Sequence, residues 1–142
     1  DRARFWAYRE SPYEYGRYLP KNIGFDVSIP LARMPEAIAA LRERIPARWP
    51  DAVHVAFGHI ADSNIHITVA REGMDAAVYR AIEGVVYDIV AELGGSVSAE
   101  HGIGRNKRPY LHISRTEPEL ALMATLKQAL DPQGLLNPGR VL

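Results

Sequence analysis

Two short stretches of the chain hold the residue types that bind metals and move protons. In the first, residues 58–66 (GHIADSNIH), the imidazoles of His59 and His66 lie seven positions apart. A hairpin folded within this stretch would bring both within reach of one metal ion. Asn64 lies two residues before His66, so their side chains would point to the same face of a strand. Taken singly, a histidine in a turn is more often an ordinary polar surface residue.

The second stretch, residues 98–104 (SAEHGIG), offers the carboxylate of Glu100 beside the imidazole of His101. Two histidines and one glutamate form a familiar three-ligand set that leaves coordination positions open for water or substrate. An imidazole titrates near neutral pH, so His101 would be placed to act as a general base. Spacing does not show that the two stretches meet, and a plain surface role for Glu100 is the alternative. His54 and His112 are predicted to play no part in a site.

Apolar patterns predict the elements that must position these residues. Alternation of apolar and polar residues indicates strands, and apolar residues three and four apart indicate amphipathic helices. Strands are predicted at residues 25–29, 53–57, 65–69 and 96–98, and helices at residues 34–45 (ended by Pro46), 74–93 and 117–130. The order strand, helix, strand, strand, helix, strand is that of the ferredoxin-like split βαβ arrangement. We therefore expect an α+β fold, a ferredoxin-like split βαβ antiparallel sheet followed by a small C-terminal helical segment.

The composition excludes several classes of protein. The 142 residues are about one domain, and 47% apolar with 24% charged residues is ordinary globular usage. Seventeen basic and seventeen acidic residues give zero net charge, which argues against nucleic-acid and membrane-surface partners. Cysteine is absent, which excludes disulfides and thiolate ligands. No apolar run approaches the roughly 20 residues that a transmembrane helix needs. The chain opens on Asp1, so we expect it to begin within a longer protein.

Five motifs follow one another along nearly the whole chain. They are WAYRE at residues 6–10, DVSIP at 26–30, GHIADSNIH at 58–66, SAEHGIG at 98–104 and DPQGLLNPGR at 131–140. Together they resemble the C-terminal region of the FAD-linked oxidases, the D-lactate, glycolate and D-2-hydroxyglutarate dehydrogenase type of the vanillyl-alcohol oxidase superfamily. In that family the third motif reads Gly-His-x-Gly-Asp-Gly-Asn-x-His and the fourth Ser-x-Glu-His-Gly-x-Gly.

The resemblance implies roles for the residues that match these motifs. His59, His66 and Glu100 would bind a divalent metal, which we expect to be zinc, manganese or iron. The substrate's hydroxyl and carboxylate would complete its coordination. His101 would take the hydroxyl proton while the flavin receives a hydride from the substrate.

Three further residues match family positions with other roles. Arg9 would grip the substrate carboxylate, for which a planar guanidinium is well suited; a surface salt bridge with Glu10 or a neighbouring residue is its alternative. Asn64 would hold the substrate or orient a ligand. Asn137 would contact the flavin, although a plain structural turn fits it equally well.

The implied enzyme oxidises a D-2-hydroxy acid to a 2-oxo acid and passes the hydride to FAD. FAD would be bound mainly by an N-terminal domain that lies outside this chain, and the electron acceptor is not identified. Alone, the chain is expected to be inactive. We divide it into the end of a helical segment (1–23), a ferredoxin-like substrate domain (24–98) and a C-terminal helical segment that packs toward the FAD domain (99–142). A cytoplasmic location is expected, with room for peripheral membrane association of the full-length enzyme.

The chain departs from the family motifs at three positions. Ala61 and Ser63 replace two glycines, and where a glycine had positive φ the replacement would cost about 1 kcal/mol. Because the metal ligands are intact, we expect an altered turn and not a lost site. Some hydroxyglutarate-type members carry a lysine at the position of Gly24. Arg17 and Lys21 are the candidates to replace that cation for a substrate with a second carboxylate.

Two other interpretations remain open on sequence grounds. The chain could be a non-catalytic ferredoxin-like module that binds metal or senses a ligand, since that fold hosts many functions. It could also be a degenerate family member that has lost its metal. The pairing of Glu100 with His101 argues against a pure binding module, because binding needs the ligand and not the adjoining base.

Overall fold

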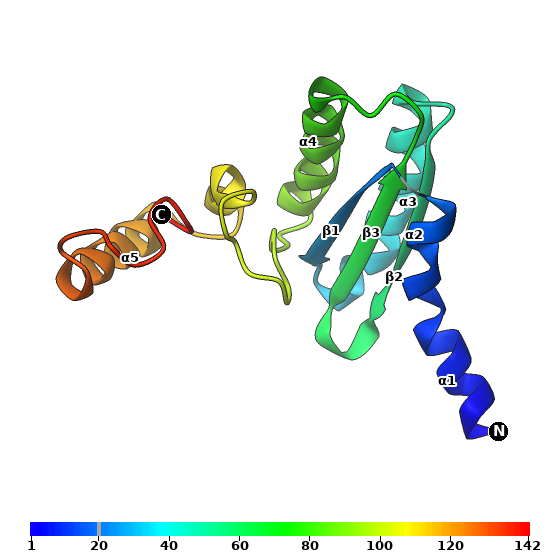
Figure 1. The fold of residues 1–142 in the computed structure, drawn as a ribbon, viewed down its shortest axis with the longest axis horizontal. Coiled ribbons are helices and arrows are strands. Elements are labelled where there is room, and N and C mark those ends of the chain that lie inside the picture. The colour runs from blue at the N-terminus through cyan, green and yellow to red at the C-terminus, as the bar shows by residue number, and fades with distance from the viewer. Residues whose placement is uncertain (20) are drawn as a thin grey trace.

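The computed structural model describes residues 1–19 and 21–142, and its centre is an antiparallel sheet of three strands (Figure 1). The strands are β1 (Asn22–Ser28), β2 (Val53–His59) and β3 (Asn64–Ala70), in the order β1-β3-β2. A short 3-10 turn, η3 (Ile60–Asp62), joins β2 to β3. The central strand is therefore β3, and both of its neighbours run antiparallel to it.

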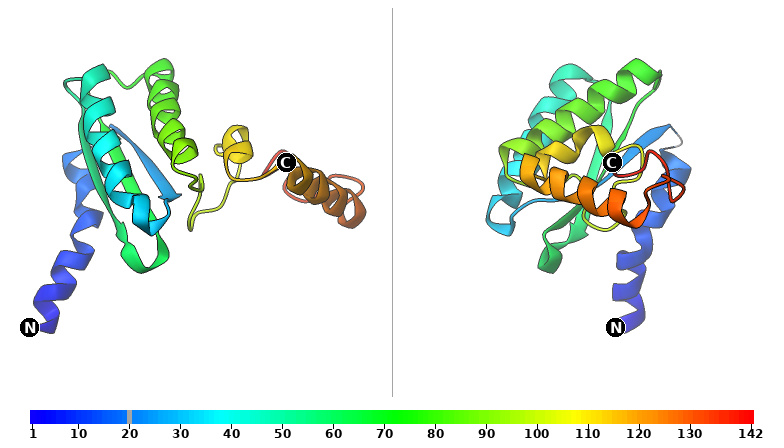
Figure 2. Two further views of the ribbon diagram at one scale, coloured as in Figure 1. Left: turned by 180° about the vertical axis from the view of Figure 1, so that it is seen from behind. Right: turned by 90° about the vertical axis from the view of Figure 1, so that its left-hand side faces the viewer.

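Two helices, α3 (Met34–Arg48) and α4 (Ala76–Glu92), cover one face of the sheet (Figure 2). A further 3-10 turn, η2 (Leu31–Arg33), leads into α3. The core between the helices and the sheet includes Ile23, Phe25 and Val27 of β1, Ile65, Ile67 and Val69 of β3, Leu41 and Ile45 of α3, and Ile82, Val86 and Val90 of α4. Full burial of such a side chain is worth about 1.5–3 kcal/mol. This apolar layer fixes the sheet whose other face carries the polar residues.

The helix α3 continues past Pro46, which the sequence predicted as its end. A proline removes one backbone donor and crowds the preceding turn. Here the flanking Ile45 and Trp49 are buried, and the Trp49 N–H donates to the Ile45 carbonyl at 2.9 Å. Packing of these two side chains offsets the local cost, so the helix reaches Arg48.

The α+β class and the antiparallel sheet are confirmed, but the fourth strand predicted at residues 96–98 is wrong. One bridge forms there, in which Ser28 and Ser96 exchange backbone hydrogen bonds of 3.0 and 2.9 Å. It lies on the free edge of β1, where a ferredoxin-like sheet would hold its fourth strand. Pairing stops because the N–H groups of residues 97–101 donate mainly to side-chain oxygens, including the carboxylate of Asp26, instead of to the β1 backbone.

Further segments flank this two-layer body at both ends of the chain. Before β1 come α1 (Arg2–Glu10), η1 (Ser11–Glu14) and α2 (Tyr15–Tyr18), and after α4 come η4 (Arg108–Ile113) and α5 (Glu117–Leu130). The first and last helices extend on opposite sides of the body and have no buried residue (Figure 1). Within the described part of the chain, no helix is both long and apolar enough to cross a membrane.

Candidate metal centre and active site

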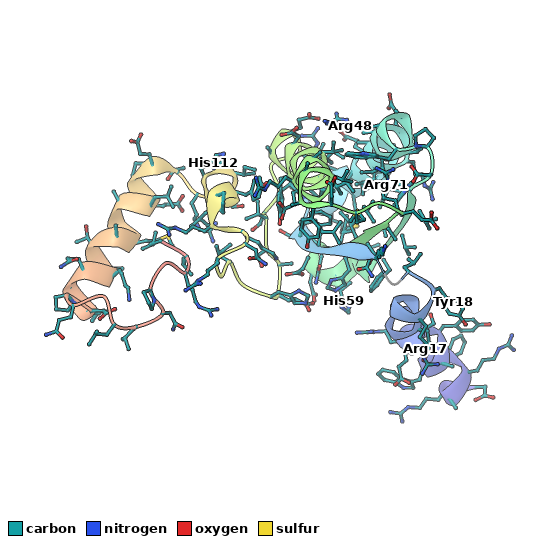
Figure 3. All side chains as sticks on the ribbon, turned by 45° about the horizontal axis from the view of Figure 1, so that its top comes forward. Arg17, Tyr18, Arg48, His59, Arg71 and His112 are labelled. Carbon is teal, nitrogen blue, oxygen red and sulfur yellow. The ribbon has the colours of Figure 1, made fainter. Side chains whose placement is uncertain are left out.

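The sheet face turned away from α3 and α4 carries most of the predicted site residues. The strand register places Asp26 of β1 and Phe57 of β2 on either side of His66 in β3. Two positions further along, Asn64 of β3 lies opposite His59 of β2. Figure 3 shows His59 on this side of the sheet, away from the helices. The hairpin thus brings the two predicted histidine ligands together.

Glu100 joins these two histidines from a distant part of the chain. The three residues each offer one ligand atom, and these atoms lie within 4.8 Å of one another. Of the two histidines, His59 comes closer to the glutamate, with 3.6 Å between His59 Nε2 and Glu100 Oε1. The rings of His59 and His66 meet edge to face with centroids 5.5 Å apart. The two sequence stretches therefore meet, which spacing alone did not show.

Asn64 lies beneath this cluster and donates a hydrogen bond to one of its members. It is 2% exposed, and its Nδ2 donates to Glu100 Oε1 at 2.6 Å. The same nitrogen is 3.5 Å from His66 Nε2. The amide oxygen is buried without a hydrogen-bond partner among the described residues. This contact fits the ligand-orienting role, one of the two that the motif implied for Asn64.

One cavity of about 480 Å³ joins the cluster to the two other residues implied in chemistry. It is lined by His59, His66 and Glu100, and also by His101 and Arg9. The His101 ring stacks beside that of His66, with centroids 5.8 Å apart. Among the described residues Arg9 makes no ion pair, so the predicted alternative of a bridge to Glu10 is not formed.

The remaining candidates lie elsewhere. Asn137 lines a separate, mainly apolar pocket between α5 and the C-terminus. His54 and His112 are absent from both groups of residues that could hold a metal. Arg17 pairs with Glu14 on the surface, and Lys21 lines a pocket at the other end of the sheet. Neither of the two predicted replacements for a lysine at Gly24 is therefore among the residues lining the site cavity.

Sequence reasoning missed the residue at the centre of this arrangement, Asp26. Its carboxylate is 1% exposed, and Oδ2 accepts the backbone N–H groups of Ala99, Glu100 and His101 at 3.2, 2.8 and 2.8 Å. Burial alone would raise the pKa of Asp26. The donated N–H bonds of His101 and Glu100 and the positive charge of Lys107 outweigh it, so that this pKa is lowered and the carboxylate is ionised.

Lys107 is the second residue that the sequence did not single out. Its ammonium group donates to the Asp26 carbonyl at 3.1 Å and to Ser98 Oγ at 3.0 Å, and lies 3.5 Å from Asp26 Oδ2. Burial lowers the pKa of Lys107, and the charge of Asp26 opposes that shift. For Asp26, the sequence did contain a signal. Aspartate is depleted in strands, and Asp26 stands between two core residues, Phe25 and Val27.

The hairpin turn also explains the two glycine replacements. Ser63 has φ of 59°, the left-handed conformation in which a side chain is strained, whereas Ala61 lies in η3 with no positive φ. Near the end of β2, before the turn, there is no space for a side chain at Gly58. A Cβ there would lie 2.1 Å from the Asn64 carbonyl oxygen. Only one of the two departures therefore carries the expected strain.

The donor set fits a divalent metal. Two imidazole nitrogens and one carboxylate oxygen form the three-ligand arrangement of catalytic sites, in which further positions stay open. An imidazole at His101 and a guanidinium at Arg9 line the same cavity. Together they could hold a small anionic molecule and accept a proton from it.

Known proteins resemble this chain over almost its full length. The family model described as "FAD linked oxidases, C-terminal domain" matches residues 1–141. The mitochondrial D-2-hydroxyglutarate dehydrogenase of Bos taurus is 41% identical over 138 residues, 96% of this chain and 25% of that protein. The D-2-hydroxyglutarate dehydrogenase of Xanthomonas citri pv. viticola is 40% identical over 146 residues, 98% of this chain and 30% of that protein. The D-2-hydroxyglutarate--pyruvate transhydrogenase of Saccharomyces cerevisiae is 32% identical over 145 residues, 97% of this chain and 29% of that protein. The chain thus spans 25–30% of the length of these relatives.

Proposed function

Since this chain belongs to the family of FAD-linked oxidases, whose C-terminal domain it carries, we propose that it is the substrate- and metal-binding part of an FAD-dependent 2-hydroxy-acid dehydrogenase. The complete enzyme would oxidise a D-2-hydroxy acid to a 2-oxo acid. One observation carries the proposal: His59, His66 and Glu100 converge in a cavity that His101 and Arg9 also line. The names of the relatives, D-2-hydroxyglutarate dehydrogenases among them, support the substrate class.

The metal is proposed to be zinc, manganese or iron, held by His59, His66 and Glu100. When bound, it would polarise the substrate hydroxyl and lower the pKa of that group. Asn64 holds the Glu100 carboxylate in place through its 2.6 Å hydrogen bond. The same carboxylate oxygen, Oε1, lies 3.6 Å from His59 Nε2, and the cavity is lined by Glu100 and by both histidines.

The other residues act on the substrate. Arg9 would bind the substrate carboxylate: it lies on the cavity wall and forms no ion pair with another described residue, which leaves the guanidinium available. His101 would accept the hydroxyl proton as the Cα hydrogen leaves with its electron pair, so that a carbonyl forms in place of the alcohol. Flavin would supply the acceptor for that hydride.

The flavin is proposed to be bound mainly outside residues 1–142. The exposed apolar side chains of the C-terminal segment, Leu122, Leu126, Leu130, Leu135 and Leu136, support packing of residues 99–142 toward another domain. A flavin contact by Asn137 remains part of the proposal, since it lies in this segment. We propose residues 1–23 as the end of a helical segment and 24–98 as the substrate domain. On this division the isolated chain is expected to be inactive.

The location and the second carboxylate of the substrate remain predictions. A cytoplasmic enzyme is proposed, although the name of the bovine relative is that of a mitochondrial protein. Arg9 is the one Arg or Lys among the residues lining the cavity in the described chain. A substrate with a second carboxylate would therefore need a cation from outside these lining residues. The alternative is a substrate with a single carboxylate.

The first test is the metal content of the intact protein, measured by plasma mass spectrometry. We expect about one divalent metal per chain, as three-ligand sites hold, and its loss in a His59→Ala, His66→Ala double variant. A matched His54→Ala, His112→Ala variant removes the same number of imidazoles and should keep its metal. A wild-type protein that takes up none of the three metals would contradict the proposal.

A second measurement separates the enzyme from the non-catalytic module. The flavin-loaded intact protein is offered a series of D-2-hydroxy acids with an artificial electron acceptor. Oxidation of at least one of them, absent with the L-enantiomers, is expected. Metal binding without any such oxidation would favour the metal-binding or ligand-sensing module instead.

A further inference from the structure

Asp26 is a buried charge that the chemistry proposed above does not use. Its side chain lies on the site face of β1, directly opposite His66 in the strand register, and is 1% exposed. An ionised carboxylate out of water is costly unless its oxygens are matched by donors. The groups that surround each of the two oxygens indicate the role of Asp26.

One oxygen of Asp26 builds the turn that presents two site residues. Oδ2 accepts the backbone N–H groups of Ala99, Glu100 and His101, and Ser98 Oγ lies 3.3 Å from it. These donors come from 72–75 positions away in the chain. This single atom therefore fixes the backbone that carries Glu100, which lies beside His59 and His66, and His101, which lines the cavity.

The other oxygen has no hydrogen-bond partner among the described residues. It faces His66, whose Nδ1 lies 3.8 Å from Oδ1. That distance is longer than a hydrogen bond, but a carboxylate can only accept, so Oδ1 favours a hydrogen on the ring nitrogen that faces it. The opposite nitrogen of the ring, Nε2, lies 3.5 Å from Asn64 Nδ2, the nitrogen that donates to Glu100 Oε1.

Resting on the metal site of the proposed function, we infer that Asp26 is a positioning residue for the metal centre. Its Oδ2 sets the turn that carries Glu100 and His101. Its Oδ1 selects the form of His66 that carries hydrogen on Nδ1, which leaves the lone pair of Nε2 directed at the metal. Carboxylates that hold ligand histidines in this way raise metal affinity, and their loss typically weakens it about 10–100-fold.

An alternative is that Asp26 binds the metal itself. Asp26, His66 and His101 also offer ligand atoms within 4.8 Å of one another. Against this, Oδ2 already accepts several N–H groups and lies 3.5 Å from the ammonium of Lys107, whose charge would repel a second cation. The positioning role is the one that uses both oxygens without that repulsion.

The diagnostic variant is Asp26→Asn in the intact protein. Its amide oxygen can still accept the N–H groups of residues 99–101, whereas its NH₂ group donates toward His66. That donation requires Nδ1 to accept, which moves the ring hydrogen to Nε2 and removes the lone pair from the metal. We expect zinc affinity, measured by chelator competition, to fall about 10–100-fold, and His66 in the metal-free variant to carry hydrogen on Nε2.

The matched control is Asp131→Asn. Asp131 also accepts two backbone N–H groups and a lysine, but lies in the C-terminal segment away from the site. It should bind zinc as the wild type does. An Asp26→Asn protein that binds zinc as tightly as the wild type would overturn the inference.

Histidine-selective ¹⁵N NMR of the wild-type protein decides the matter even if the variant does not fold. Hydrogen on Nδ1 of metal-free His66, with zinc ligation through Nε2, is expected. Hydrogen on Nε2, or ligation through Nδ1, overturns the inference. A wild-type protein that binds no zinc, manganese or iron contradicts the metal centre of the proposed function, and the metal-free spectrum still decides the role of Asp26.

Discussion

Asp26 and Asp131 use the same chemical device in two regions of the chain. Each is a buried carboxylate that accepts backbone N–H groups of a nearby turn and pairs with a lysine, Lys107 or Lys127. At Asp131 both oxygens are used: Oδ1 accepts from Leu135 N–H at 2.9 Å, and Oδ2 from Leu136 N–H at 2.9 Å and from Lys127. Each oxygen of Asp131 therefore accepts at least one hydrogen bond.

At Asp26 the donors gather on one oxygen and the other remains open toward His66. The two turns also differ in what they carry. The turn held by Asp131 carries apolar side chains, Leu135 and Leu136, which are exposed. The turn held by Asp26 carries Glu100 and His101. A buried carboxylate whose two oxygens both accept hydrogen bonds stabilises a structural turn. A carboxylate with one oxygen free of such bonds can also position a functional residue.

The largest effect is expected at the residue that the Asp26 turn presents to the cavity. His101→Gln should lower kcat about 10²–10⁴-fold, because it removes the proposed general base. Metal content should be unchanged, since the ligands His59, His66 and Glu100 are kept. Steady-state kinetics of the intact enzyme and metal analysis measure both quantities.

His112→Gln is the matched control, because His112 lies in η4 outside the cavity. It should retain wild-type kcat. Equal losses in the two variants, or no loss in His101→Gln, would break the distinction between a turn that carries chemistry and one that is structural.

Both carboxylates should make the fold sensitive to acid. Contact with the Lys127 ammonium and the Leu136 N–H lowers the pKa of Asp131 in the folded chain, and the pKa of Asp26 is also lowered. A group whose pKa is lowered by folding stabilises the fold above its ordinary pKa of about 4 and loses that contribution as pH falls through its folded value. The free energy of unfolding should therefore decline below about pH 4.

Denaturant titrations across this pH range check the prediction. Asp131→Asn should be less stable than the wild type near neutral pH, and the difference should shrink in acid. Asp88→Asn, on the exposed side of α4, serves as the control. A difference between Asp131→Asn and the wild type that is independent of pH would show that the ionised form of Asp131 adds nothing.

Much of the fold could be predicted from the sequence because its signals are local. The helix at residues 117–130 was predicted with the bounds that the structure shows, and the three strands within three residues. The family assignment from five ordered motifs is confirmed by the match over residues 1–141. These features depend on periodicity and on residues that are neighbours in the chain.

The site could be predicted only in part, because its assembly depends on distant contacts. Alternation in β1 places the side chain of Asp26 on the other face of the strand from those of Phe25 and Val27. From the sequence alone, that face is expected to be exposed to solvent. The structure covers that side chain with a turn some 75 positions later. The same contacts stopped the fourth strand at Ser96, because N–H groups that would have paired with the β1 backbone donate to the Asp26 side chain. The end of strand pairing has no local signature, and for Asp26 the local signal is limited to an aspartate between two core residues of a strand.

The smallest effect concerns the turns themselves. The C-terminal turn places Gly134 at its positive φ of 64°, whereas the site hairpin places Ser63 at 59°. A serine in this conformation is strained, so Ser63→Gly should raise the free energy of unfolding by up to about 1 kcal/mol.

Ala61→Gly should act in the opposite direction, because Ala61 has no positive φ and glycine adds freedom to the unfolded chain at a cost of roughly 0.5–1 kcal/mol. Denaturant unfolding of the two variants measures both changes. If both replacements stabilised the chain equally, the strain would belong to the hairpin as a whole and not to Ser63. Opposite signs would locate the strain at Ser63, beside the buried Asn64 that orients Glu100.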